Sequence, residues 1–104
     1  MNFNNVNASA LANIYFDGKV ISHSLTDNSG AKITLGLIHP GDYHFNTESP
    51  EKMEITSGSC DVILDGEDIN KTYNEGEYFE VPGDSGFNIS VKEGICQYVC
   101  TFLV

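Results

Sequence analysis

His44 is the side chain of this sequence best suited to general acid catalysis, because an unperturbed imidazole titrates at about pH 6.5. Alternation along an extended strand nevertheless puts His44 on the face opposite Tyr43 and Phe45. If those two rings line the interior of the protein, His44 points outward. His23 and His39 have no spacing that suggests a site, and we interpret them as surface or turn residues.

Nucleophilic catalysis by cysteine has little support. No histidine has an identifiable pairing with a cysteine, and buried thiols are usually inert. An odd number of cysteines without paired spacing also does not indicate a disulfide framework. Together with the absence of a signal sequence or a long apolar run, this predicts a cytoplasmic protein. The cysteines are Cys60, Cys96 and Cys100.

The charge balance excludes several classes of partner. The chain has 15 acidic residues against 5 basic ones, all of them lysines, and a net charge of −10. Without arginine or a basic patch, we expect no binding to nucleic acid. The same negative field disfavours anionic membranes.

The candidate histidine and cysteine residues must be positioned by strands. Apolar residues recur with period two, and turn residues interrupt them about every 8–12 residues. With 104 residues, we predict one all-β domain over residues 11–104, after a flexible arm over residues 1–10. Asp65-Gly66 is a two-residue hairpin signal. The segment 95–104 is apolar on both faces, so it is central in a sandwich or lies at a subunit interface.

Two spacings resemble the turn positions of cupin barrels: Glu51 followed by Gly58, and Gly76 followed by Pro82-Gly83. Metal-binding cupins add three histidines to the glutamate. Here only His44 and Glu51 occupy ligand positions, whereas a catalytic divalent ion normally takes three or more protein ligands. We therefore predict a cupin-like (jelly-roll) β-barrel without a functional metal.

A closer resemblance covers residues 14–103. The matching segments are YFDGKV at 15–20, GDYHFNT at 41–47, PEKME at 50–54, FEVPGDSGF at 79–87 and YVC at 98–100. They are similar to the small pyrimidine/purine nucleoside phosphorylases of the cupin superfamily. The resemblance implies a homodimer that splits purine and pyrimidine nucleosides with inorganic phosphate, without another cofactor. Two departures, Asp84 and Thr101, stand where the family often has histidine and arginine.

Within that resemblance, Lys19 is the only cation in a family-like motif and is a candidate to bind phosphate. Glu51, beside Met53, is placed to accept hydrogen bonds from ribose hydroxyls. Ser85 and the backbone amides around Gly83 and Gly86 are candidates for a small anion nest. Each residue also has a simpler structural interpretation, as a solvated lysine or part of a turn. The aromatic candidates for base stacking, which alternatively form plain core, are Tyr43, Phe45, Phe79, Phe87 and Tyr98.

Two other functions stay open at this point. The first is a non-catalytic cupin that binds a small sugar or nucleoside. The second is a metal-dependent oxygenase or isomerase, which the missing histidines disfavour.

Overall fold

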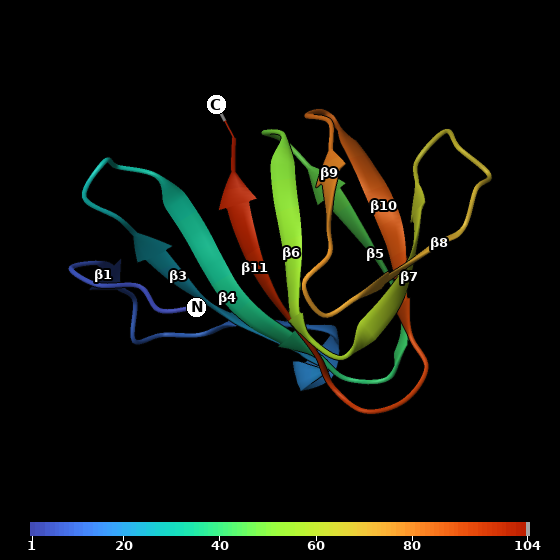
Figure 1. Ribbon diagram of the computed structural model, residues 1–104, viewed down its shortest axis with the longest axis horizontal. Helices are drawn as coiled ribbons and strands as arrows, with labels where there is room; N and C mark the ends of the chain where they lie inside the picture. The colour runs from blue at the N-terminus through green and yellow to red at the C-terminus, as the bar shows by residue number, and fades with distance from the viewer. Residues whose placement is uncertain (104) are drawn as a thin grey trace.

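The structure, a computed structural model, describes residues 1–103 and consists of strands and one short 3₁₀ turn (Figure 1). Among the described residues, no helix is long and apolar enough to cross a membrane. The elements are β1 (Asn7–Ala8), β2 (Asn13–Tyr15), η1 (Phe16–Gly18), β3 (Val20–Thr26), β4 (Lys32–Ile38), β5 (Gly41–Thr47), β6 (Glu51–Ser57), β7 (Ser59–Leu64), β8 (Lys71–Asn74), β9 (Tyr78–Val81), β10 (Ser85–Val91) and β11 (Cys96–Phe102).

Two antiparallel sheets make up the domain. The larger has the strand order β1-β3-β4-β11-β6-β9, with β2 paired to β3, and the smaller has the order β5-β10-β7-β8. From β4 onward the chain passes repeatedly from one sheet to the other (Figure 1). This alternation is the jelly-roll pattern, so the prediction of a single all-β, cupin-like barrel is confirmed.

The glycines of the two cupin-like spacings lie at strand junctions, as predicted. Gly58 and Gly76 adopt positive φ of 79° and 89°. A side chain at Gly58 would also collide with the carbonyl oxygen of Ile95, 2.7 Å from the position of a Cβ. Gly83 is required for a different reason, because a Cβ there would lie 2.8 Å from the carbonyl oxygen of Glu48. Close approach of backbone, not positive φ, therefore selects glycine at position 83.

The Asp65-Gly66 hairpin prediction is wrong in one respect. The amide of Glu67 donates to the carbonyl of Leu64, so Asp65 and Gly66 do form a tight turn. The strands on either side do not pair directly across it, because pairing resumes only at Val62 and Lys71. The turn is thus the start of a longer loop, and the Asp65 amide instead donates to the carbonyl of Gly86.

Strand β4 is turned with its apolar face outward. Ile33 belongs to a small cluster with Leu25 and Val99, and Leu35 packs against that cluster. The polar alternate residues of β4 therefore face the interior. Val99 is the apolar residue on the second face of β11, and it is buried within this single chain. Val104, at the end of the predicted strand, lies outside the described residues.

The N-terminal segment covers part of this outer cluster. Asn7 and Ala8 pair with β3, and Phe3 and Val6 pack against the Leu25 cluster. The mobility that we predicted for residues 1–10 stays a prediction, but parts of this segment have defined contacts on the larger sheet.

Candidate functional site

A cavity of about 940 Å³ lies within the domain, a size typical of small-molecule sites. Exposed residues of the β3–β4 and β5–β6 loops form part of its wall, so the cavity is open to solvent there. The lining residues are Tyr15, Phe16, Ser22, Ser29, Gly30, Ala31, Lys32, Thr34, Ile38, His44, Phe45, Asn46, Glu48, Ser49, Glu51, Met53, Phe87, Tyr98, Cys100 and Phe102.

The register of β4 and β11 arranges one wall of the cavity in levels. Tyr98 lies opposite Gly36, and Cys100 lies opposite Thr34. Lys32 comes two residues further along β4, at the open end. Because alternate residues on one strand are about 6.7 Å apart, the order along the cavity is aromatic ring, then thiol and hydroxyl, then ammonium group. Lys32 is the only lysine in the lining, which contains no arginine.

Glu51 lies opposite Phe102, nearer the open end than Cys100, and its carboxyl group reaches the middle level through its contact with Cys100. It is half-buried, and the Cys100 thiol donates a hydrogen bond to its Oε1 over 3.5 Å. Burial raises the pKa of Glu51, while the hydrogen bond from Cys100 acts in the opposite direction. Within residues 1–103, the carboxylate thus accepts this one hydrogen bond, from a weak donor. It has the capacity to accept hydrogen bonds from a ligand.

A second polar group lies at the aromatic level. Burial raises the pKa of Tyr98 to about 12, and a hydrogen bond with Ser22 acts against that shift. Ser22, which is itself buried, accepts a hydrogen bond of 3.2 Å from Asn13 Nδ2. The phenol therefore stays neutral at physiological pH and is held by a short polar chain across β11, β3 and β2.

The aromatic side of the cavity contains rings that we predicted from the sequence and rings that we missed. Phe45 and Phe87 are stacked at a centroid distance of 5.7 Å. Tyr15 and Phe16 add two half-exposed rings. Their position could not be derived from alternation, because they lie where β2 runs into η1. The predicted residues that line the cavity are Phe45, Glu51, Met53, Phe87 and Tyr98.

Four of the predicted residues do not line the cavity. Lys19 is exposed just after η1, where its amide donates to the carbonyl of Phe16. Tyr43 donates its hydroxyl to the carbonyl of His39 at 2.8 Å. Phe79 is core and packs against Tyr73 and Phe87. Ser85 is the fourth. The cavity's cation is therefore Lys32 rather than Lys19.

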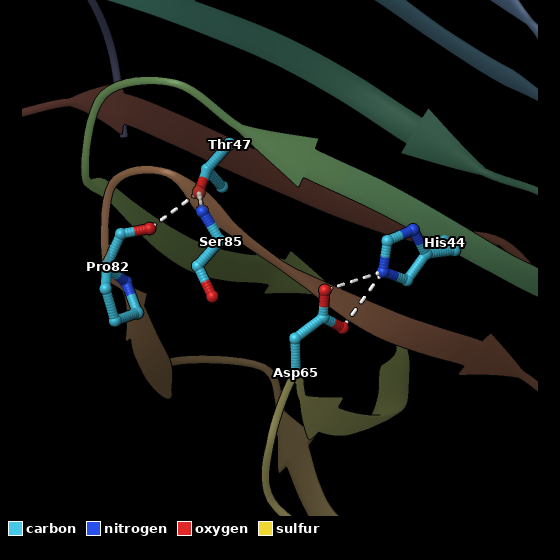
Figure 2. Close-up of polar contacts among 5 residues, drawn as sticks. All are labelled: His44, Thr47, Asp65, Pro82 and Ser85. Carbon is cyan, nitrogen blue, oxygen red and sulfur yellow. Dashed lines mark hydrogen bonds and ion pairs between the residues drawn. The ribbon is translucent and has the colours of Figure 1, made fainter.

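Two backbone amides at the predicted anion nest, those of Asp84 and Ser85, already have partners within the protein. Thr47 Oγ1 accepts a hydrogen bond from the Ser85 amide at 3.1 Å and donates to the carbonyl of Pro82 at 2.6 Å (Figure 2). The Asp84 amide donates to the carbonyl of Glu48. These hydrogen bonds instead link the β5–β6 connection to the β9–β10 connection. Neither Asp84 nor Thr101, the two departures from the family pattern, lines the cavity.

His44 is engaged at the rim. Its Nε2 lies 2.9 Å from Asp65 Oδ1, with both side chains partly exposed (Figure 2). A Cβ on Gly86 would lie 2.6 Å from Asp65 Oδ2, so this pair passes directly over Gly86. Among residues 1–103, no group of three or more His, Cys, Asp or Glu side chains is arranged to hold a metal ion.

The β3–β4 loop at the open end is held by one carboxylate. Asp27 Oδ1 accepts hydrogen bonds from the amides of Ser29 and Ala31 and from the Ser29 hydroxyl. These contacts, with the Ser29 hydroxyl first, lower the pKa of Asp27. The amides of Ser29 and Ala31 are thus occupied, and Lys32, at the start of β4, is the positively charged donor at this end of the cavity.

A jelly roll with an aromatic-lined cavity among its strands defines this protein as a small cupin-like barrel. Similar solved structures agree. A protein of unknown function from Acinetobacter sp. ADP1 has a TM-score of 0.94 at 38% identity, with 98% of each chain covered. A putative mannose-6-phosphate isomerase from Ralstonia eutropha has a TM-score of 0.67 at 16% identity, covering 89% of this chain and 91% of the other, which shows the fold alone.

The chain belongs to the pyrimidine/purine nucleoside phosphorylase family, whose family model matches residues 10–102. A relative from Methylobacillus flagellatus named pyrimidine/purine nucleoside phosphorylase is 51% identical over 100 residues, which cover 96% of each chain. The resemblance inferred from short motifs is thereby confirmed.

Proposed function

We propose that this protein is an enzyme that cleaves purine and pyrimidine ribonucleosides with inorganic phosphate. The products are a free base and α-D-ribose 1-phosphate. The observation that carries the proposal is the order of aromatic rings, carboxyl group and ammonium group along one cavity, in a chain that belongs to this family.

Each level of the cavity suits one part of the substrates. The aromatic rings offer π faces to a base, and the Glu51 carboxylate accepts hydrogen bonds from ribose hydroxyls. Lys32 supplies a point charge for phosphate. Lys19 served this role in the sequence-based prediction, but its place outside the cavity favours Lys32.

The chemical step needs positioning more than it needs a cofactor. One oxygen of the hydrogen phosphate dianion bonds to C1′, the bond from C1′ to the base nitrogen breaks, and the proton of the phosphate ends on the departing base. The sugar passes through an oxocarbenium-like state, as in glycoside hydrolysis. Holding phosphate beneath C1′ removes up to about 7–11 kcal/mol of the barrier. We therefore propose phosphate as co-substrate and no metal.

We also propose that the protein is a homodimer in the cytoplasm. Ile14, Ile21 and Leu37 lie in one cross-strand row on the outer face of the larger sheet, and Ile14 is 64% exposed. Exposed apolar surface favours an interaction site, and two-fold dimers are the commonest closed assembly. Sedimentation at micromolar concentration tests the dimer, and a clean monomer contradicts it. The three free thiols suit a reducing compartment.

The activity is tested by incubating uridine and adenosine with and without phosphate, and measuring free base and ribose 1-phosphate. A Glu51→Gln protein purified in the same way is the matched control, because it reveals any contaminating phosphorylase from the host. Base release that requires phosphate and is strongly reduced in the variant supports the proposal. Nucleoside binding without turnover would instead assign the protein to the non-catalytic alternative.

A further inference from the structure

The turn that carries Phe16 has an unusual backbone. Phe16, Asp17 and Gly18 have consecutive positive φ of 52°, 56° and 89°. Glycine adopts this region freely, but it costs roughly 1–2 kcal/mol for each other residue, and a bulky residue there is an outlier. Such conformations persist where the surrounding structure over-determines them, and they concentrate at functional sites.

Burial of the Phe16 ring does not explain this cost. The ring lies 5.0 Å from Tyr43 and 5.6 Å from Phe45 between centroids, yet 45% of the residue remains exposed. The interplanar angles are 51° and 87°, so neither contact is a parallel stack. The strained turn therefore places an aromatic ring at the cavity wall with much of its surface open.

We propose that Phe16 is the residue on which the base of the nucleoside stacks. This inference rests on the proposed function, which it extends by naming the contact that determines base tolerance. Every base has a π face, so stacking accepts purines and pyrimidines without reading their hydrogen-bonding groups. Tyr15, 47% exposed and in edge-to-face contact with Phe45, flanks the same place.

The placement agrees with the levels of the cavity. Phe16 contacts Phe45 on the aromatic side, and Lys32 lies at the opposite, open end of β4. A base on Phe16 thus leaves the Glu51 level for ribose and the Lys32 level for phosphate. Phe16 is then a substrate-binding residue that alternation along strands does not reveal.

The protein contains no tryptophan, which makes a direct binding test possible. A Phe16→Trp protein carries one indole at the proposed stacking site. A Tyr78→Trp protein carries one at an exposed position on β9 outside the cavity lining. We expect uridine and adenosine to quench the fluorescence of the first protein saturably and not that of the second. Equal quenching in both proteins, or none in the first, would overturn the inference.

Kinetics give an independent reading. Phe16→Leu keeps an apolar side chain but removes the π face, so we expect KM for uridine and for adenosine to rise about tenfold or more. KM for phosphate should stay unchanged, and Phe16→Tyr should restore nucleoside KM. Thermal melts verify that each variant is folded. A folded Phe16→Leu protein with wild-type nucleoside KM contradicts the proposal. A variant that changes the oligomeric state in sedimentation but leaves nucleoside KM unchanged contradicts it as well.

The two tests separate this inference from the proposed function. Saturable quenching requires no turnover, so an inactive protein that still quenches would refute phosphorolysis and support stacking. Normal phosphorolysis by Phe16→Leu, with unchanged nucleoside KM, would support the proposed activity and refute stacking on Phe16.

Discussion

Gly36 and Tyr98 face each other across β4 and β11, and the tyrosine ring occupies the space that a side chain at position 36 would need. A Cβ on Gly36 would lie 2.5 Å from the Tyr98 hydroxyl oxygen. The absence of a side chain at position 36 therefore leaves the space that the Tyr98 ring occupies in the cavity wall.

Gly36→Ala should displace this ring. We expect a loss of about 1–3 kcal/mol in the free energy of unfolding, as is usual for overpacking, and a raised nucleoside KM. Urea denaturation and steady-state kinetics measure the two effects. In a double-mutant cycle with Tyr98→Leu, the cost of Gly36→Ala should largely disappear. Strictly additive costs would show that the two residues do not interact in this way.

Lys32→Ala should impair the use of phosphate. Loss of one preorganised charged donor is expected to reduce phosphorolysis by about 10²–10³-fold. Stability should hardly change, because an exposed lysine contributes little. Lys19→Ala is the matched control, since it removes the same charge outside the cavity and should retain near wild-type rates. The reverse ranking of the two variants would restore the Lys19 hypothesis.

Glu51→Gln should have lower activity than the wild type. Its stability relative to the wild type should increase as pH rises. Because burial raises the pKa of Glu51 above the ordinary value of a glutamate side chain, the folded state binds this proton more tightly than the unfolded chain does. That contribution is complete below the unfolded pKa and is lost as pH rises through the folded one. The neutral glutamine avoids the loss. We expect similar melting temperatures at pH 3.5, a higher one for the variant at pH 7, and activity about 10²-fold lower.

Thr47 joins two chain connections through one hydroxyl, so Thr47→Val should be costly. It leaves the Ser85 amide and the Pro82 carbonyl without their partner. The two hydrogen bonds are partly buried and each contributes about 0.5–1.5 kcal/mol, so we expect a loss of about 1–3 kcal/mol. Thr47→Ser keeps the hydroxyl and should lose less. A chemical denaturation curve for each variant decides this, and equal costs would point to lost packing instead.

Exhaustive chelation should leave phosphorolysis unchanged. The proposed chemistry uses phosphate, Lys32 and Glu51 without a metal ion. Rates before and after chelator treatment, with elemental analysis of the protein, provide the test. Restoration of a lost activity by zinc, iron or manganese would overturn the metal-free mechanism.

Alternation in the sequence predicted the strands and much of the cavity, but not which face of β4 is inside. Ile33 and Leu35 lie in the outer cluster, whereas Lys32 and Thr34 line the cavity. Hydrophobicity misleads here for two physical reasons. A binding cavity needs polar walls, and N-terminal residues distant in sequence cover the outer apolar cluster.

The residues at turns were the least predictable. Phe16 lines the cavity on a left-handed turn, and its ring packs against Tyr43 and Phe45. The Ser85 amide is held by Thr47 away from the cavity lining. Both outcomes depend on tertiary contacts that spacing cannot encode. By contrast, Glu51 and Met53 lie on a regular strand, where period two was enough to place both on one face.

The inward polar face of β4 also implies an uneven distribution of local opening. Near its C-terminal end, β4 contributes Ile38, which is fully buried beside Val20 and Cys96, whereas its N-terminal end contributes Lys32 and Thr34 to the cavity wall. Segments with few buried apolar contacts open at lower free energy than the core. In hydrogen-exchange experiments, amides around residues 26–34 should therefore exchange through local fluctuations, while those near Ile38 and Cys96 should require global unfolding. The end of the barrel that admits a ligand would then open locally, while the end around Ile38 stays folded.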